Sequence, residues 1–185
     1  MKHFGAVASA CAWLCLIGAG AGAGSVQAQS GPATPSSPQP SSLQETYDDW
    51  LVVCRTLADR KRQCSMVQNQ VDGKTKQRVL TLELAAGPDR TTLTAVLPFG
   101  LDLAAGIVLA SDDGGLRQVL RFRTCLPIGC VVPAVLDAKA VASLKKARLL
   151  LLTTSMDNGQ PMELKGSLKG FPAAYDRVLA LSSGN

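Results

Sequence analysis

Histidine is almost absent from this chain of 185 residues, whose one histidine is His3. His3 falls in an N-terminal segment that we expect to be cleaved off, so the mature chain would contain no imidazole. This absence excludes Ser-His-Asp and Cys-His catalysis and removes the usual imidazole ligands of catalytic zinc. It also removes the side chain best suited to proton transfer near neutral pH. An enzyme would therefore have to work with carboxylates, lysine, tyrosine or thiols.

Other sequence signatures of ligand chemistry are missing as well. The chain contains no phosphate-binding loop and no Gly-x-Gly-x-x-Gly motif, and we expect no cofactor. Aromatic residues make up 4% of the chain, and they do not interleave with a basic stripe as they do in nucleic-acid-binding surfaces. The formal net charge of +5 is small, and the basic residues are mostly scattered along the chain. It predicts no nucleic-acid partner but leaves peripheral association with anionic lipid or polysaccharide open.

Carboxylates occur as adjacent pairs at Asp48-Asp49 and Asp112-Asp113. Asp112-Asp113 is followed by two glycines, which is typical of a turn, and Asp48-Asp49 precedes an apolar run. We interpret both pairs as structural. A glycan-cleaving enzyme is the alternative, and it would require two carboxylates within about 5–10 Å of each other in a cleft.

The N-terminus has the pattern of a secretory signal peptide over residues 1–28. A positively charged start is followed by an apolar run from Phe4 to Ile17, small residues, and the cleavage-like sequence Val26-Gln27-Ala28. Residues 29–43 are rich in proline and serine and lack apolar periodicity, which predicts a disordered linker. Residues 44–185 then form one domain by length. We expect the protein in the periplasm, either free or associated with the outer membrane, or secreted, with no transmembrane helix after cleavage.

Four cysteines remain after the expected cleavage, and an even number in an exported protein predicts disulfides. Spacing favours the pairs Cys54–Cys64 and Cys125–Cys130 among the three connectivities that four cysteines allow. The segments around Cys54 and Cys64 have the pattern of two strands joined by a polar tip, so a hairpin would bring the two side chains opposite each other. A redox site or a four-thiolate metal site is the weaker alternative, because such sites normally contain more closely spaced cysteine pairs.

Turn signals recur between segments of alternating hydrophobicity, notably Asp72-Gly73, Asp113-Gly114 and Asn158-Gly159. Many short strands joined by hairpins predict a mainly β domain. We expect a disulfide-stapled antiparallel β-sandwich, either jelly-roll-like or a partly closed barrel. The predicted strands lie near 48–55, 62–71, 77–85, 91–97, 103–110, 116–124, 130–136, 148–156 and 162–168.

Two helices interrupt this β pattern. A short helix is expected over 138–146, with Asp137 as its N-cap. A C-terminal amphipathic helix is expected because five apolar residues recur at helical spacing. These residues are Phe171, Ala174, Tyr175, Val178 and Leu179.

The order and spacing of several motifs resemble the invasion-associated locus B family, which are exported proteins of Gram-negative bacteria. The resemblance covers the chain from Trp50 to about Leu181 and implies a disulfide-bonded β-sandwich in the periplasm or at the cell surface. Some members are linked to entry of pathogens into host cells, but the resemblance supplies no reaction, cofactor or catalytic residue. The chain departs from the family pattern in its apolar run after Arg148 and in lacking a glycine after the short helix. The motifs are Trp50…Cys54, Cys64, Leu97-Pro98-Phe99-Gly100-Leu101, Phe122-x-x-Cys125-x-x-x-Gly129-Cys130, Leu144-Lys145-Lys146 and Ser167-Leu168-Lys169-Gly170-Phe171-x-x-Ala174.

These observations favour a non-enzymatic interaction domain that binds an envelope protein, a glycan or a host component and contributes to host-cell association or invasion. A periplasmic folding or stress-resistance factor is the first alternative, and a carboxylate-dependent glycan-cleaving enzyme is the second. A rigid sandwich presents recognition residues on its loops, so Arg60, Lys61 and Arg62 at the first hairpin tip are the candidate contact residues. A merely soluble charged turn is the plainer interpretation of the same three residues.

Overall fold

Side chains alternate between buried and exposed positions along most strands, and this alternation builds two antiparallel sheets. The computed structural model describes residues 42–58, 61–87 and 90–183. The expected signal peptide (1–28), most of the expected linker (29–43) and Arg60 lie outside these residues. In spatial order the larger sheet contains β1 (Ser42–Tyr47), β2 (Trp50–Thr56), β3 (Arg62–Val71), β4 (Arg78–Ala86), β5 (Thr91–Leu97), β9 (Gly129–Leu136) and β8 (Thr124–Leu126). The smaller sheet contains β11 (Pro161–Ser167), β10 (Leu149–Ser155), β6 (Ile107–Ser111) and β7 (Arg117–Leu120).

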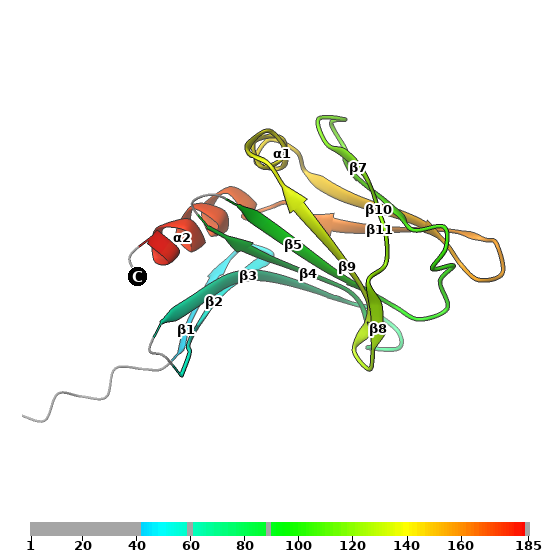
Figure 1. Cartoon of the computed structure of the whole chain (residues 1–185), viewed down its shortest axis with the longest axis horizontal. Helices are drawn as coiled ribbons and strands as arrows, with labels where there is room; N and C mark the ends of the chain where they lie inside the picture. Colours follow the sequence, from blue (N-terminus) through cyan, green and yellow to red (C-terminus); the bar gives the residue numbers. More distant parts are fainter. Residues whose placement is uncertain (1–41, 59–60, 88–89, 184–185) are drawn as a thin grey trace, which may run out of the picture. The chain divides into compact units, whose positions relative to one another are not determined.

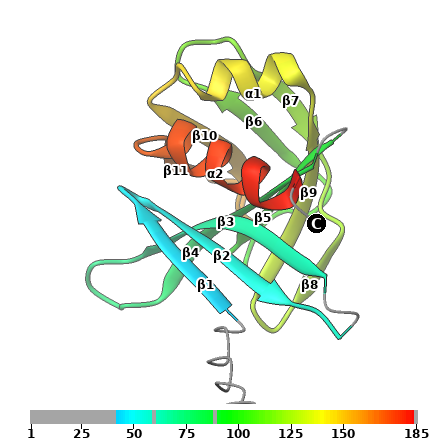
Figure 2. The same ribbon diagram turned by 90° about the vertical axis from the view of Figure 1, so that its left-hand side faces the viewer.

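One face of the seven-stranded sheet carries the core. On β4, for example, Leu80, Leu82 and Leu84 are each at most 1% exposed, whereas the residues between them are half-buried. The C-terminal helix α2 (Phe171–Ser183) contacts β1 to β4 on this face, while β11 contacts β4 and β7 contacts β9 (Figures 1 and 2). The mainly β, disulfide-bonded sandwich predicted from the sequence is confirmed.

Helix α2 forms where the apolar spacing predicts it. Phe171, Tyr175 and Val178 are buried against the sheet, and the ring of Phe171 packs edge-on against Trp50 at a centroid distance of 5.5 Å. The Tyr175 hydroxyl shares a hydrogen bond of 2.7 Å with the Thr91 hydroxyl, so this buried aromatic residue also has its polar group satisfied. The apolar side of this helix therefore packs into the core.

The short helix α1 (Ala138–Leu144) also forms, with its last residue two positions before the predicted end. The Asp137 carboxylate accepts a hydrogen bond from the Ala140 backbone N–H at 2.7 Å, as an N-cap does. Val141 and Leu144 are buried and form the apolar side of this helix.

Strand β1 is a difference from the sequence prediction, because it begins inside the segment predicted to be a disordered linker. It pairs along its whole length with β2, from Ser42 opposite Arg55 to Tyr47 opposite Trp50. A bidentate ion pair joins Glu45 to Arg177 of α2, with donor–acceptor distances of 2.7 and 2.8 Å. This long-range partner stabilises a strand whose own sequence has little apolar alternation.

The predicted strand over 116–124 is wrong, because the chain changes sheets within it. Strand β7 pairs with β6 in the smaller sheet, and β8 pairs with β9 in the larger one. Leu120 and Phe122 are both packed against the core, so the alternating pattern continues through the crossover and hides it. The preceding predicted strand (103–110) is also shorter than expected, since β6 begins only at Ile107.

Glutamine side chains of β3 hold the free edge of β11. The Gln68 amide donates to the Ser167 carbonyl at 2.8 Å and accepts from the Ser167 N–H at 2.9 Å. Gln70 donates to the Lys165 carbonyl on the same edge, and the indole of Trp50 donates to the Ser167 carbonyl at 3.0 Å. These side chains take the place of a neighbouring strand where the two sheets are not paired.

Candidate functional site

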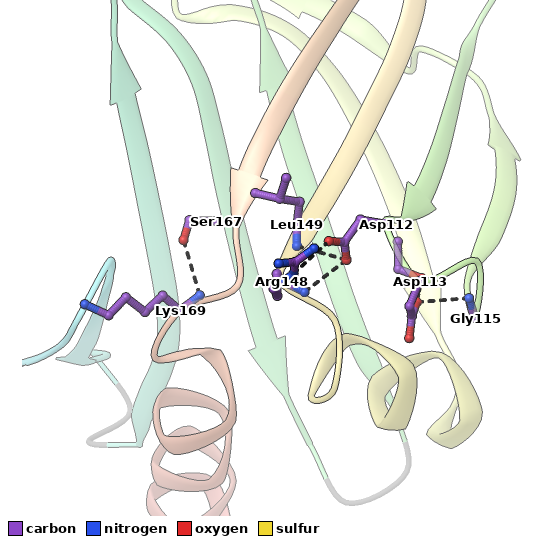
Figure 3. Close-up of polar contacts among 8 residues, drawn as sticks. Asp112, Asp113, Gly115, Arg148, Leu149, Ser167 and Lys169 are labelled. Atoms are coloured by element: carbon purple, nitrogen blue, oxygen red, sulfur yellow. Dashed lines mark hydrogen bonds and ion pairs between the residues drawn. The ribbon is translucent and has the colours of Figure 1, made fainter.

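The pair Asp112-Asp113 follows β6 and bonds to backbone groups (Figure 3). Asp112 accepts the N–H groups of Arg148 and Leu149 at 3.0 and 3.2 Å, which fixes the start of β10. These two bonds hold the pKa of Asp112 below its ordinary value, and the nearby Arg148 guanidinium acts in the same direction.

Asp113 has an equally local role. Its carboxylate accepts hydrogen bonds from the Ser111 hydroxyl and from the Gly115 N–H, the latter at 3.0 Å. The Ser111 bond is the main cause that lowers the pKa of Asp113. A general acid of a glycosidase needs a raised pKa. The pair therefore has the chemistry of a turn, as the two following glycines predict.

The pair Asp48-Asp49 forms the turn between β1 and β2 and anchors it to the segment before α2. Asp49 accepts the Ser167 hydroxyl at 2.6 Å, and Asp48 lies 3.2 Å from the Lys169 ammonium group. The Lys169 N–H in turn donates to the Ser167 hydroxyl (Figure 3). Both carboxylates thus connect elements of the fold.

The structure joins the four described cysteines in the two pairs that the spacing favours, Cys54–Cys64 and Cys125–Cys130. Each pair lies at directly opposite positions of two neighbouring strands, with Cα–Cα separations of 4.1 and 3.9 Å. The first bond closes the β2–β3 hairpin, and the second closes the loop between β8 and β9. Within the described ranges, no group of three or more His, Cys, Asp or Glu side chains is arranged to hold a metal ion.

Two of the candidate contact residues, Lys61 and Arg62, lie beside a recess at the β2–β3 end of the larger sheet. Lys61 and Arg62 line a cavity of about 380 Å³, and Arg90 from the β4–β5 connection lines it as well. Leu57 and Ala86 give it an apolar part. We call this the basic recess. Arg60, the third residue of the predicted tip, lies outside the described residues.

Sequence reasoning missed Arg90. It is an isolated arginine in the sequence, and only the antiparallel pairing of β3 with β4 and of β4 with β5 brings it to the end where β3 begins. The described lining residues of the basic recess include cations but no carboxylate. This composition suits a ligand with an anionic group beside an apolar part.

The fold and these sites define a class of protein: a disulfide-bonded antiparallel β-sandwich whose adjacent acidic residues serve turns and whose surface carries a basic recess. The family model described as "Invasion associated locus B (IalB) protein" matches residues 50–179. The chain belongs to the invasion-associated locus B family. None of the helices that the structure describes is both long and apolar enough to cross a membrane.

Three known proteins illustrate the similarity. An "Invasion protein B homolog" of Brucella abortus (strain 2308) is 47% identical over 145 residues, which are 77% of this chain and 82% of the relative. "Invasion protein B" of Bartonella bacilliformis is 33% identical over 144 residues, covering 76% of this chain and 77% of the relative. The crystal structure of invasion associated protein B from Bartonella henselae superposes with a TM-score of 0.72 at 29% identity, covering 77% of this chain and 98% of that one.

Proposed function

We propose that this protein is exported by a Gram-negative bacterium and contributes to host-cell association or invasion by binding a partner rather than by catalysis. The names of its relatives in Brucella and Bartonella support the invasion role. The signal-peptide pattern of residues 1–28 and the four cysteines supporting two disulfides suit the periplasm or the cell surface. The partner is an envelope protein, a glycan or a host component.

The observation that carries the proposal is the basic recess. The β2–β3 hairpin supplies Lys61 and Arg62, and the β4–β5 hairpin supplies Arg90. The disulfide Cys54–Cys64 cross-links the β2–β3 hairpin. A cross-linked hairpin presents its contact residues with little loss of conformational entropy on binding. The recess therefore suits an anionic group of a macromolecular partner, with rim charges that steer the encounter.

A complementation experiment tests this function. A deletion strain receives either the wild-type gene or a variant with Lys61→Gln and Arg90→Gln, and host-cell association is counted for each strain. A matched control carries Lys146→Gln and Lys165→Gln, which remove two exposed lysines outside the recess.

We expect the recess variant to lose most of the wild-type association and the control variant to retain it. Immunoblots of fractionated cells verify that all three proteins are exported in equal amounts. Equal host-cell association of the two variants, with both fully exported, would show that the recess is not the contact site.

A further inference from the structure

Exposed apolar side chains gather at the end of the larger sheet opposite the basic recess. The described residues include eight exposed large hydrophobic side chains. Four of them lie where β3 ends, just past the end of β5, and where β8 and β9 meet, and β8 marks this end in Figure 1, away from α2. We call these four residues the apolar tip: Val71, Phe99, Leu126 and Ile128.

Strand register places several of these residues in one row. Val71 is the partner of Arg78 across β3 and β4. The β4–β5 register, continued past its last pair, places Arg78 opposite Phe99. The β5–β9 register, continued in the same way, places Phe99 opposite Ile128. Arg78, Phe99 and Ile128 also line one shared depression of about 490 Å³.

Two of these side chains are exposed at positions next to buried or constrained backbone. Phe99 is 59% exposed although Leu97 and Leu101, two residues away on either side, are 1% and 6% exposed. Ile128 sits in the loop closed by the disulfide Cys125–Cys130. The next residue, Gly129, has φ of 130°, and a Cβ there would collide with the Leu97 carbonyl oxygen. The loop that presents Ile128 is therefore constrained both by the disulfide and by the tight approach of Gly129 to Leu97.

The loops that surround the apolar tip carry a basic excess. Segments 71–78, 98–106, 121–129 and 156–160 contain five basic and three acidic residues. Asp72 and Asp102 use their carboxylates to accept N–H groups of their own turns. The basic residues are Lys74, Lys76, Arg78, Arg121 and Arg123, and all five are exposed.

We propose that the apolar tip inserts into the surface of a lipid bilayer that contains anionic lipids. Exposed apolar residues on several loop tips, within a basic rim, match a headgroup layer above acyl chains. The long stem of Arg78 can lie along the apolar row while its guanidinium contacts phosphate. When the apolar tip inserts, the basic recess lies at the far end of the sheet and faces away from the bilayer. The two ends are roughly 30 Å apart, which is the length of the nine-residue strand β4.

Vesicle co-sedimentation tests the proposal with the protein as the producing bacterium processes it. The probe is phosphatidylcholine vesicles with roughly one-third phosphatidylglycerol, compared with pure phosphatidylcholine. The test variant is Phe99→Ser with Ile128→Ser. The matched control is Val119→Ser with Val135→Ser, which removes two hydrophobic residues that are 73% and 58% exposed elsewhere on the domain. All proteins carry the same N-terminus, so any contribution from it cancels.

We expect the wild type and the control variant to bind anionic vesicles alike, and the test variant to lose about tenfold or more in partitioning, since two large side chains no longer leave water. Binding should weaken with salt. A second reporter, Phe99→Trp, should show a blue-shifted emission on the same vesicles.

The proposal is overturned if the wild type does not bind anionic vesicles at low salt or if both double variants lose binding equally. It is also overturned if sedimentation shows that the tip mediates self-association instead. Host-cell association of the recess variants is a separate readout, so either proposal can fail alone.

Discussion

The Gln68 side chain stabilises the contact between the two sheets, and its replacement should be among the most destabilising single changes in the domain. Gln68 is 4% exposed. Its amide donates to the Ser167 carbonyl at 2.8 Å and to the Asp49 carbonyl at 3.3 Å, and its oxygen accepts the Ser167 N–H at 2.9 Å. In Gln68→Met the volume is nearly kept, so the effect comes mainly from hydrogen bonding.

The expected loss of stability depends on which backbone groups lose their hydrogen-bond partners. The Ser167 carbonyl keeps the Trp50 indole as a donor at 3.0 Å, whereas the Ser167 N–H loses the acceptor that the structure gives it. Each lost hydrogen bond contributes about 1 kcal/mol, and an orphaned buried N–H costs about 1–3 kcal/mol. We therefore expect Gln68→Met to lower the free energy of unfolding by about 2–4 kcal/mol.

Urea unfolding at pH 7 with the disulfides intact measures this change. Gln70→Met is the matched control, because Gln70 is partly exposed and donates to a single backbone carbonyl of the same edge, and at 3.2 Å to the Gln68 side-chain oxygen. It should lower the free energy of unfolding by about 1 kcal/mol or less. A Gln68→Met protein within about 0.5 kcal/mol of the wild type would show that Gln68 does not stabilise the contact between the sheets, since surface changes alone fall in that range.

Three further changes have defined outcomes. Gly170→Ala should lower the free energy of unfolding by about 2 kcal/mol or more, because Gly170 has φ of 81° and a Cβ would collide with the Tyr47 carbonyl oxygen. Thermal unfolding measures this change, and an unchanged melting temperature would contradict it. The lowered pKa of Asp112 means that its stabilising contribution is present above its ordinary pKa and is lost as the pH falls through the lowered one. The free energy of unfolding should therefore decline as the pH falls below about 4. In urea titrations at these pH values, an Asp112→Asn protein should show a shallower decline than the wild type. Identical pH dependence of the two proteins would contradict this role of Asp112. Serine at all three positions 60–62 should shift the melting temperature by about 2 °C or less, since charged tip residues are mostly solvated, and a large drop would show that they are structural.

Features that depend on short stretches of sequence could be predicted. The β2–β3 hairpin and its disulfide follow from two strand patterns joined by a polar tip, so Cys54 and Cys64 are neighbours without any knowledge of the rest of the fold. Helix α2 follows from apolar residues at helical spacing, and each of Phe171, Tyr175 and Val178 is buried. In both cases the local pattern and the tertiary packing agree.

Features that depend on distant partners could not be predicted. Strand β1 contains little apolar alternation, and it is held by an ion pair between Glu45 and Arg177, 132 residues apart. Gln68 looks like an ordinary polar residue in a strand, but its partner Ser167 is 99 residues away. The sequence shows how side chains alternate along each strand, but it does not show which strands lie next to each other in the sheet. The basic recess and the apolar tip both depend on that order of strands.

Photo-cross-linking in living cells tests whether the protein acts by binding a partner at the basic recess. A photoreactive residue replaces Gln63, which lines the recess, and a control carries it at Ala142, which is exposed on α1. We expect one enriched envelope, glycan-linked or host partner to be captured from position 63. This partner should be absent from position 142 and lost when Lys61→Gln and Arg90→Gln are added. A position-63 product that is equally abundant with both cations removed, or no product beyond that of the control, would contradict this expectation.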